Sequence, residues 1–287
     1  MKLGNREFDL GPFKKPVIMG ILNVTPDSFS DGGKYDSLDK ALKHAEEMID
    51  EGADIIDIGG ESTRPGAIKV TAQEEIERVC PIIEKIKENF DTVVSLDTFK
   101  PATARAGLSA GLDIFNDVMG LRYSSRTDSF LLDGEKSEMA EIVAESGKPV
   151  VIMHNRKQKM EDISQEAYLD MIDNDLRDSL RLAKEAGIKD EMIILDPGVG
   201  FAKTYEQNLL SLKEVERLNA FGYPVLLGIS RKSYIGNTLN LPENERLEGT
   251  VASDVYGFLH GCCIFRVHDV KENKRALDMV YKIYSQQ

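Results

Sequence analysis

Polar side chains suited to an anionic small molecule recur along this chain, each close behind a short apolar run. Guanidinium and ammonium groups are the usual protein donors to phosphate oxygens, and Arg64, Lys232 and Arg266 supply them. Amides and carboxylates can pair with the N–H and C=O groups of a heterocycle. The residues in these positions are Asn23, Thr63, Arg64, Asp97, Asn116, Asp196, Lys232, Arg266 and His268. Together they predict a site for an anionic, heterocyclic small molecule.

The stretch 52–66 indicates which elements would hold such residues. Its β-branched run 54–58 is typical of a strand that is buried on both faces. Gly59 and Gly60 end this strand, and a loop of charged and hydroxyl side chains follows. Beyond the loop, residues 73–90 have apolar side chains at three- and four-residue spacings, which predicts an amphipathic helix. The unit is therefore a strand, a polar loop and a helix.

This unit recurs along the whole chain. The runs that predict strands are 17–22, 54–58, 92–96, 113–115, 149–153, 192–195, 223–229 and 262–265. Because strands alternate with helices, we expect a parallel sheet with helical crossovers. Eight units without a linker favour a single α/β domain over residues 1–287, a closed (β/α)₈ TIM barrel.

Two further features support the barrel. An open doubly wound sheet would need a Gly-x-Gly-x-x-Gly motif after the first strand, and the chain lacks one there. Residues 1–16 contain two short extended pieces, which predict an N-terminal hairpin that closes one end of the barrel. Active sites of such barrels lie at the carboxyl ends of the strands, so the polar residues above are expected to meet at one face.

Composition narrows the class of function. A net charge of −13 and a pI near 4.9 argue against a nucleic-acid partner and against an anionic membrane surface. No apolar run reaches the roughly 18 residues of a membrane span, and the first residues lack the apolar core of a secretory signal. Cys80, Cys262 and Cys263 form no disulfide framework, and the adjacent pair is expected to face opposite sides of a strand. We expect a soluble, cytoplasmic enzyme.

With its motifs in this order, the sequence resembles dihydropteroate synthase. The matching runs include Gly-Gly-Glu-Ser-Thr-Arg-Pro-Gly at 59–66 and Asp-Pro-Gly-Val-Gly-Phe at 196–201. The other matching runs are 20–33, 95–98, 116–118, 230–233 and 266–270. The resemblance implies condensation of 6-hydroxymethyl-7,8-dihydropterin diphosphate with p-aminobenzoate, with release of diphosphate, for folate biosynthesis. It also implies Mg²⁺ as cofactor, a homodimer and a target for sulfonamides.

The resemblance also implies a role for each matching residue. The pterin-ring contacts would be Asp97, Asn116, Asp196 and Lys232, and the diphosphate contacts Thr63, Arg266 and His268. Asn23 matches the Mg²⁺ position. The p-aminobenzoate pocket would contain Phe29, Pro65, Ser230 and Lys232. Asp31 and Arg64 match polar residues of two mobile loops, and Asp97, Lys232, Asp31 and Arg64 are the residues expected to be catalytic.

Some features depart from the family pattern, and other interpretations stay open. Ala202 stands where many members have a glycine, and residues 123–134 look like an insertion. A pterin-dependent methyltransferase domain, which works with a corrinoid partner, shares this barrel, and so would a non-catalytic pterin-binding paralogue. Taken singly, Asp97 could also be a helix cap, Asn116 a loop hydrogen-bonding residue and Lys232 a solvated charge.

Overall fold

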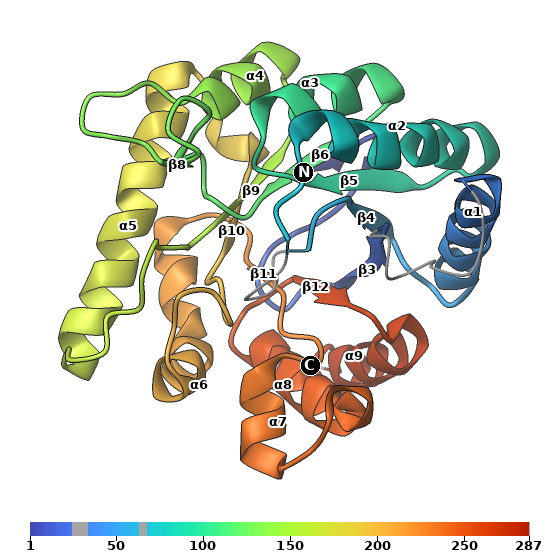
Figure 1. Cartoon of the computed structure of the whole chain (residues 1–287). Coiled ribbons are helices and arrows are strands. Elements are labelled where there is room, and N and C mark those ends of the chain that lie inside the picture. The colour runs from blue at the N-terminus through green and yellow to red at the C-terminus, as the bar shows by residue number, and fades with distance from the viewer. Residues whose placement is uncertain (25–33, 63–67, 287) are drawn as a thin grey trace.

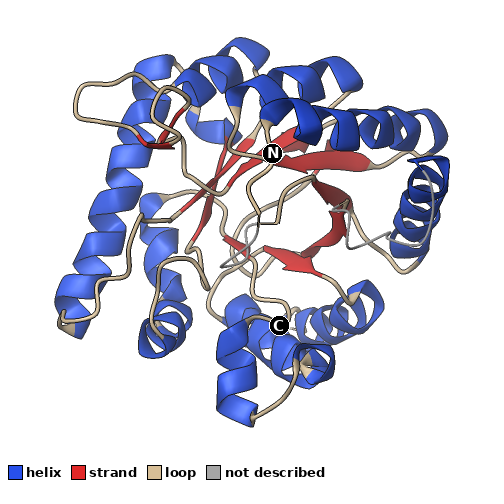
Figure 2. Cartoon of the chain, in the orientation of Figure 1, coloured by secondary structure: helices blue, strands red, loops and turns tan. Residues whose placement is uncertain are grey.

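The computed structural model describes residues 1–24, 34–62 and 68–286, with the side chains of 34–37 left aside. Eight parallel strands form the central sheet, in the order β10-β9-β6-β5-β4-β3-β12-β11 (Figure 1). A single backbone bridge between Leu195 and Val225 joins the two outer strands, β10 and β11. The sheet is therefore a nearly closed barrel with helices outside it (Figure 2), as the sequence predicts.

The strands of the barrel begin and end close to the predicted positions. Their bounds are β3 Val17–Asn23, β4 Ile55–Gly59, β5 Val93–Asp97, β6 Ile114–Asp117, β9 Val150–Met153, β10 Ile193–Asp196, β11 Leu226–Leu227 and β12 Ile264–Val267. The seventh strand, predicted over 223–229, is regular only at β11. Pro224 has no N–H to donate, and Gly228 is followed by a turn, so the hydrogen-bonded ladder is confined to the residues between them.

Helices follow the strands and cover the barrel. Their bounds are α1 Lys34–Asp50, α2 Ala72–Asn89, α3 Pro101–Ala110, α4 Glu138–Ser146, α5 Gln165–Ala186, α6 Tyr205–Lys213, α7 Ser233–Leu239, α8 Leu247–Leu259 and α9 Val270–Tyr284. Short 3₁₀ helices are η2 Asp190–Met192, η3 Val215–Phe221 and η4 Glu243–Glu245. The start of α2 has a capping box, in which Thr71 and Glu74 satisfy each other's backbone N–H groups.

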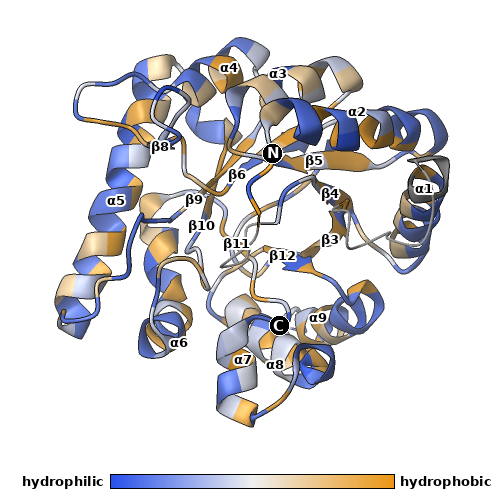
Figure 3. Ribbon diagram, viewed as in Figure 1, coloured by the Kyte–Doolittle hydropathy of each residue, from blue (hydrophilic) through white to orange (hydrophobic). Residues whose placement is uncertain are grey.

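Two hydrophobic clusters build the core. The larger one lies between strands and helices, where the buried faces of both elements pack together. The hydropathy colouring in Figure 3 shows hydrophobic β5 and β6 beside helices with mixed faces. The smaller cluster fills the barrel interior at the amino ends of the strands. Cys262 belongs to the larger cluster and Cys263 to the smaller one, which confirms that the adjacent cysteines face opposite sides.

The N-terminal hairpin closes the amino end of the barrel, as predicted. It pairs β1 Lys2–Leu3 with β2 Arg6–Glu7 in antiparallel register. Leu3 and Leu10 are buried in the interior cluster against residues of the barrel strands. Their burial excludes water from this end, so any ligand would have to enter from the carboxyl end.

The segment that looks like an insertion forms a second hairpin beside α4. It pairs β7 Tyr123–Ser124 with β8 Ser129–Phe130. At its tip, Asp128 accepts hydrogen bonds from Tyr123 Oη at 3.0 Å and Lys69 Nζ at 2.5 Å. The hairpin thus contacts the connection between β4 and α2.

Candidate active site

A polar layer lies directly above the apolar interior cluster, toward the carboxyl ends of the strands. Side chains of a strand alternate between its two faces, so residues two apart share the barrel interior. On five of the strands, moving two residues toward the carboxyl end exchanges an apolar side chain of the cluster for a polar one. The pairs are Ile55 and Asp57, Val93 and Ser95, Ile114 and Asn116, Ile194 and Asp196, and Ile264 and Arg266. The strand period therefore gathers the predicted residues at one level.

Arg266 is the centre of this layer. Its Nε donates to Asp57 Oδ2 at 2.6 Å, and its Nη2 donates to Asp97 Oδ2 at 2.8 Å. Asn116 Nδ2 donates to the same Asp57 oxygen at 3.1 Å. The four side chains come from β12, β4, β5 and β6, so tertiary packing joins parts of the chain that are far apart in sequence.

The charges of this layer are coupled. Burial raises the pKa of Asp97 to about 7; Arg266 opposes the rise, and the carboxylate of Asp57 adds to it. Burial acts to lower the pKa of Arg266, but Asp57 and Asp97 outweigh it and the pKa is raised. Arg266 therefore remains a cation, and Asp97 titrates near neutral pH.

Asp57 is a site residue that the sequence interpretation missed. It is fully buried, and its Oδ1 has no hydrogen-bond partner among the described residues. A buried carboxylate normally pairs with a cation or a donor, and here Oδ2 does so while Oδ1 does not. The detectable signal was an acid between the isoleucines of the run 55–58, at the spacing that faces the barrel interior.

Two glycines leave room between site residues. A Cβ added to Gly59 would lie 3.6 Å from Asn23 Oδ1 and 3.6 Å from Asp97 Cβ. One added to Gly228 would lie 3.5 Å from Asp196 Oδ2 and 3.8 Å from Arg266 Cβ. Asn23 and Asp196 therefore belong to the same constellation as Arg266 and Asp97.

The turn after β10 contacts Lys232, which comes from the loop after β11, over this layer. Asp196 Oδ1 accepts from the backbone N–H of Gly198 at 2.7 Å, and Lys232 Nζ donates to the carbonyl of Val199. The Lys232 ammonium lies 4.7 Å from the centre of the Phe201 ring. Burial lowers the pKa of Lys232 to about 8, although Asp196 opposes the change. Lys232 is therefore a desolvated cation at the mouth of the barrel, not a solvated surface charge.

Ser230 and His268 form a second contact at the mouth. Ser230 Oγ lies 3.1 Å from the backbone N of His268, which donates to it, and 3.0 Å from His268 Nδ1. Next to them, Arg231 forms an ion pair with Asp269. These contacts join the loops after β11 and β12, the position at which barrels of this kind often bind phosphate.

The structure therefore brings Asn23, Asp97, Asn116, Asp196, Ser230, Lys232, Arg266 and His268 to one end of the barrel. Asp97 pairs with Arg266 and is no helix cap, because α3 begins after Lys100 without a side-chain cap. The predictions at Phe29, Asp31, Thr63, Arg64 and Pro65 lie outside the described residues.

The part of the chain that the structure describes offers a divalent cation no ready-made cluster of acidic or soft ligands. Within the described ranges, no cluster of three His, Cys, Asp or Glu side chains could hold a metal ion. The amide oxygen of Asn23 is a hard oxygen donor near Asp97 at the end of β3. Mg²⁺ commonly takes one or two protein oxygens and completes its shell with water and substrate phosphates. This donor set fits Mg²⁺ carried by a diphosphate.

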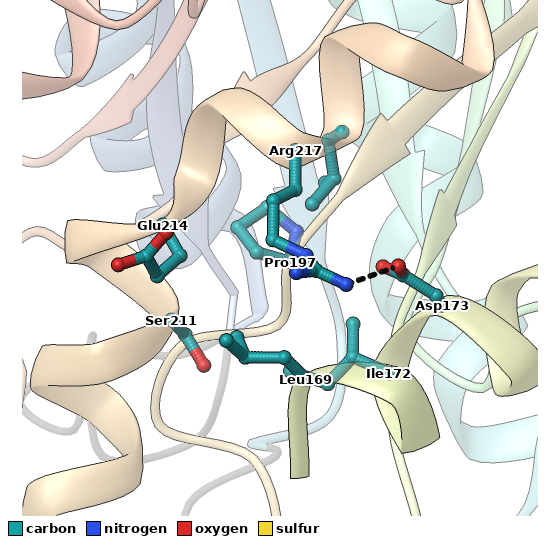
Figure 4. A pocket seen from close by; sticks show the side chains of 8 residues that line it. Leu169, Ile172, Asp173, Pro197, Ser211, Glu214 and Arg217 are labelled. Atoms are coloured by element: carbon teal, nitrogen blue, oxygen red, sulfur yellow. Dashed lines mark hydrogen bonds and ion pairs between the residues drawn. The ribbon is translucent and has the colours of Figure 1, made fainter. Parts of the chain in front are cut away.

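A small cavity lies behind the turn, between α5 and the α6–η3 segment (Figure 4). Its volume of about 10 Å³ has room for one water molecule, so it does not admit a substrate. Pro197 forms one wall, and Arg217 Nη2 donates to Asp173 at 2.7 Å beside it. The turn is thus supported from outside the barrel by packed helices.

Comparison with known proteins agrees with this arrangement. The family described as pterin binding enzyme matches residues 19–268. A dihydropteroate synthase of Clostridium beijerinckii is 51% identical over 285 residues, which cover 97% of each chain. That of Bacillus subtilis is 49% identical over 267 residues, covering 93% of this chain and 88% of the relative. The chain therefore belongs to the dihydropteroate synthase family of pterin-binding enzymes.

Solved structures show the same fold. A dihydropteroate synthase from Clostridium difficile, determined in the presence of pteroic acid, superposes with a TM-score of 0.88 at 45% identity, covering 98% of this chain and 100% of that one. The enzyme of Xanthomonas albilineans, with 4-aminobenzoic acid, gives a TM-score of 0.86 at 36% identity, with 96% and 95% covered. In the part of the chain that the structure describes, no helix combines the length and the apolar character needed to cross a bilayer.

Proposed function

We propose that this chain condenses 6-hydroxymethyl-7,8-dihydropterin diphosphate with p-aminobenzoate and releases diphosphate. The observation that carries the proposal is the polar layer in which Asp57, Asn116 and Asp196 are buried and Asp97 and Arg266 are half-buried. Such a layer offers closely spaced acceptors and donors to a heterocycle and a cation to an anion. The names of the relatives and the ligands in their structures support the same reaction.

The chemistry follows from the substrates. The bond between the pterin methylene carbon and a diphosphate oxygen breaks, and the arylamine nitrogen bonds to that carbon and loses one proton to solvent. Positive charge develops on the methylene and spreads into the electron-rich ring. Asp97, fixed by Arg266, would stabilise that charge electrostatically, because a preorganised carboxylate needs no reorientation during reaction. No covalent bond to the protein is required.

The pterin pocket would use both carboxylates and cations. Asp196 and Asn116 would pair with ring N–H and C=O groups, and Lys232 would donate to the ring while its stem lines the arylamine pocket with Ser230. Asp57 would fix Asn116 and Arg266, since it accepts a hydrogen bond from each. In this assignment Asp196 binds the pterin ring, whereas Asp57 positions Asn116 and Arg266.

The diphosphate would bind at the ends of β3 and β12. Two of the five N–H groups of Arg266 donate to Asp57 and Asp97, which leaves others for phosphate oxygens. His268 would add a further contact, and Asn23 would hold Mg²⁺ that neutralises charge on the leaving group. Thr63 stays part of this proposal on the resemblance alone, as do Phe29, Asp31, Arg64 and Pro65 for the arylamine side.

The remaining expectations belong to the same proposal. We expect a homodimer in the cytoplasm, a requirement for Mg²⁺ and inhibition by sulfonamides that resemble p-aminobenzoate. Sedimentation of the purified protein tests the dimer, and activity in excess chelator tests the metal. Full turnover without free Mg²⁺ would contradict the role of Asn23.

One assay tests the reaction itself. Diphosphate release is measured from dihydropterin diphosphate with and without p-aminobenzoate. A synthase releases diphosphate only, or far faster, when the arylamine is present. A pterin-dependent methyltransferase or a non-catalytic binding protein would show no such dependence, and that result would overturn the proposal.

A further inference from the structure

Behind the turn at 196–201 lies a buried lysine that the proposed reaction does not use. Lys203 is 4% exposed, and its Nζ donates to the carbonyls of Gly198 at 2.8 Å and Phe201 at 3.2 Å. The same Nζ lies 2.9 Å from His154 Nδ1. An ammonium group has three N–H donors, and these three acceptors use all of them. A buried cation with a complete set of acceptors holds its neighbours in one geometry.

His154 connects this lysine to the outer helix α5. Its Nε2 lies 3.1 Å from Asp175 Oδ2, and the imidazole is 1% exposed. Because Nδ1 faces an ammonium, it accepts, and the ring proton must be on Nε2 and point to the carboxylate. Burial and, to a smaller extent, the charge of Lys203 lower the pKa of His154 to about 3, so the imidazole is neutral.

Asp175 is anchored in turn by two arginines. Arg122 and Arg156 lie 3.7 Å and 3.5 Å from its carboxylate oxygens. Asp175 belongs to α5, which runs along the outside of β9 and β10 (Figure 1). The chain of contacts therefore runs from a long rigid helix, through the end of β9, to the turn that follows β10.

The other face of the turn presents its groups to the barrel mouth. Between the two carbonyls that Lys203 holds lies Val199, whose own carbonyl accepts from Lys232. At one edge the N–H of Gly198 holds Asp196, and at the other the ring of Phe201 lies beside the Lys232 ammonium. Lys203 thus fixes both ends of a segment that orients Asp196 and Lys232.

The turn has little freedom to adopt another shape on its own. Gly198 has φ +65°, and a Cβ there would lie 1.9 Å from the carbonyl oxygen of His154. Ala202 has φ +45°, in the left-handed region that an alanine seldom occupies. A strained turn pressed against β9 needs an anchor, and Lys203 follows immediately in sequence.

We propose that Lys203, held by His154 and Asp175, is a positioning residue that sets Asp196 and Lys232 for binding of the pterin ring. This inference rests on the proposed function, because it concerns the pterin half of that site. The anchored turn belongs to the pterin half of the site. It follows β10, whereas the diphosphate contacts proposed among the described residues lie at the ends of β3 and β12.

The test is a Lys203→Met variant, which keeps much of the side-chain volume and removes the ammonium. Calorimetric titrations use 6-hydroxymethyl-7,8-dihydropterin as one ligand and inorganic diphosphate with Mg²⁺ as the other. Burial lowers the pKa of Lys203 to about 7, so the titrations are run near pH ~6, where the ammonium form predominates. We expect pterin affinity to fall by about tenfold or more, as for loss of a buried charged hydrogen bond, with less than a ~2-fold change for diphosphate.

A matched control is Lys87→Met. Lys87 donates to Asp113 at 2.7 Å and to the carbonyl of Thr92 at 3.2 Å, at the amino end of the barrel. Lys87→Met also removes an ammonium group and its hydrogen bonds, but away from the turn, so the affinity for neither ligand should change. Should Lys203→Met not fold, Asp175→Asn weakens the far end of the chain of contacts while conserving shape, and it should reduce pterin affinity alone.

Two outcomes would overturn the inference. Unchanged pterin affinity in a folded Lys203→Met or Asp175→Asn protein would show that the turn needs no anchor. Equal losses for pterin and diphosphate would indicate general damage. The proposed function fails separately, if the unsubstituted protein binds no pterin in the same titration.

Discussion

The same strands build two layers of the barrel interior, and these layers follow different physical rules. The lower layer is the apolar interior cluster at the amino ends of the strands, and the upper layer is the polar layer at their carboxyl ends. Below, Ile55, Val93 and Ile114 pack with the N-terminal hairpin in a dry apolar cluster. Two residues further along the same strands, Asp57 and Asn116 lie buried beside charged groups. Burial of the lower layer is favourable in itself, whereas burial of the upper layer is tolerated only because each charge has a partner.

This contrast teaches where stability and function separate in the fold. The lower layer needs only the correct volume and can be exchanged for other apolar side chains at small cost. The upper layer has no such freedom, because removal of one partner leaves another charge buried. Substitutions in the two layers should therefore differ in kind, not only in size.

The largest effect is expected for Lys232→Ala, which removes the cation above the polar layer. The rate of condensation should fall by about 10³-fold, equivalent to about 4 kcal/mol in the barrier, because both substrates lose a contact. The melting temperature should not fall, since burial opposes the charge of Lys232. Steady-state kinetics and calorimetric melting check both parts. Normal turnover would show that the assignment at the end of β11 is wrong.

A pair of substitutions on β4 compares the layers directly. Asp57→Ala leaves Arg266 and Asn116 without their shared acceptor and should reduce the free energy of unfolding by about 3–5 kcal/mol. Ile55→Ala should cost about 2–5 kcal/mol through its cavity. Urea unfolding would give similar values, but only Asp57→Ala should weaken pterin binding. If both substitutions weakened pterin binding equally, the two layers would not differ in function.

The pH profile tests the coupled charges of the upper layer. Burial raises the pKa of Asp97 to about 7, and burial lowers that of Lys232 to about 8. Catalysis needs the carboxylate and the ammonium, so kcat/KM should decline below about 7 and above about 8. In Lys232→Arg the alkaline limb should vanish, because a guanidinium stays charged. A wild-type profile flat from about 6 to 9 would contradict these roles.

Asp97 also makes the free energy of unfolding depend on pH. This contribution falls as the pH rises, whereas ionisation of Asp97 increases the activity. The folded protein retains a proton on Asp97 that the unfolded chain releases above its ordinary pKa of 3.8. The contribution of Asp97 to the free energy of unfolding is therefore greatest at low pH and is lost as the pH rises to about 7. Asp97→Asn should remove that slope in chemical unfolding, while the apolar layer contributes no pH dependence.

The smallest effect is expected at Ala202, in the turn beside the upper layer. Its φ of +45° is strained for alanine, so Ala202→Gly should raise the free energy of unfolding by about 0.5–1 kcal/mol. Ala167→Gly, at an exposed position of α5, should lower it by a similar amount. Thermal unfolding of the two variants checks the signs. Destabilisation by both would show that the turn is unstrained.

Much of this protein could be predicted from its sequence. The repeated pattern of strand, loop and helix predicted the barrel, because the periodicity of a strand or helix is a short-range property of the sequence. The same pattern predicted the end of the barrel at which Asp97, Lys232 and Arg266 lie. The order of the motifs identified the family. The seventh strand was predicted too long, since apolar composition alone does not show where Pro224 and Gly228 interrupt the ladder.

Only the tertiary structure decided which charges pair and what supports them. Arg266 meets Asp57 and Asp97 across 209 and 169 residues of sequence, a contact that no local pattern encodes. Likewise, Lys203 reaches His154 from another strand unit, 49 residues away. A sequence determines how each strand alternates, but the energy of a buried charge depends on neighbours that come together only when the barrel closes, and those neighbours set its pKa and its role.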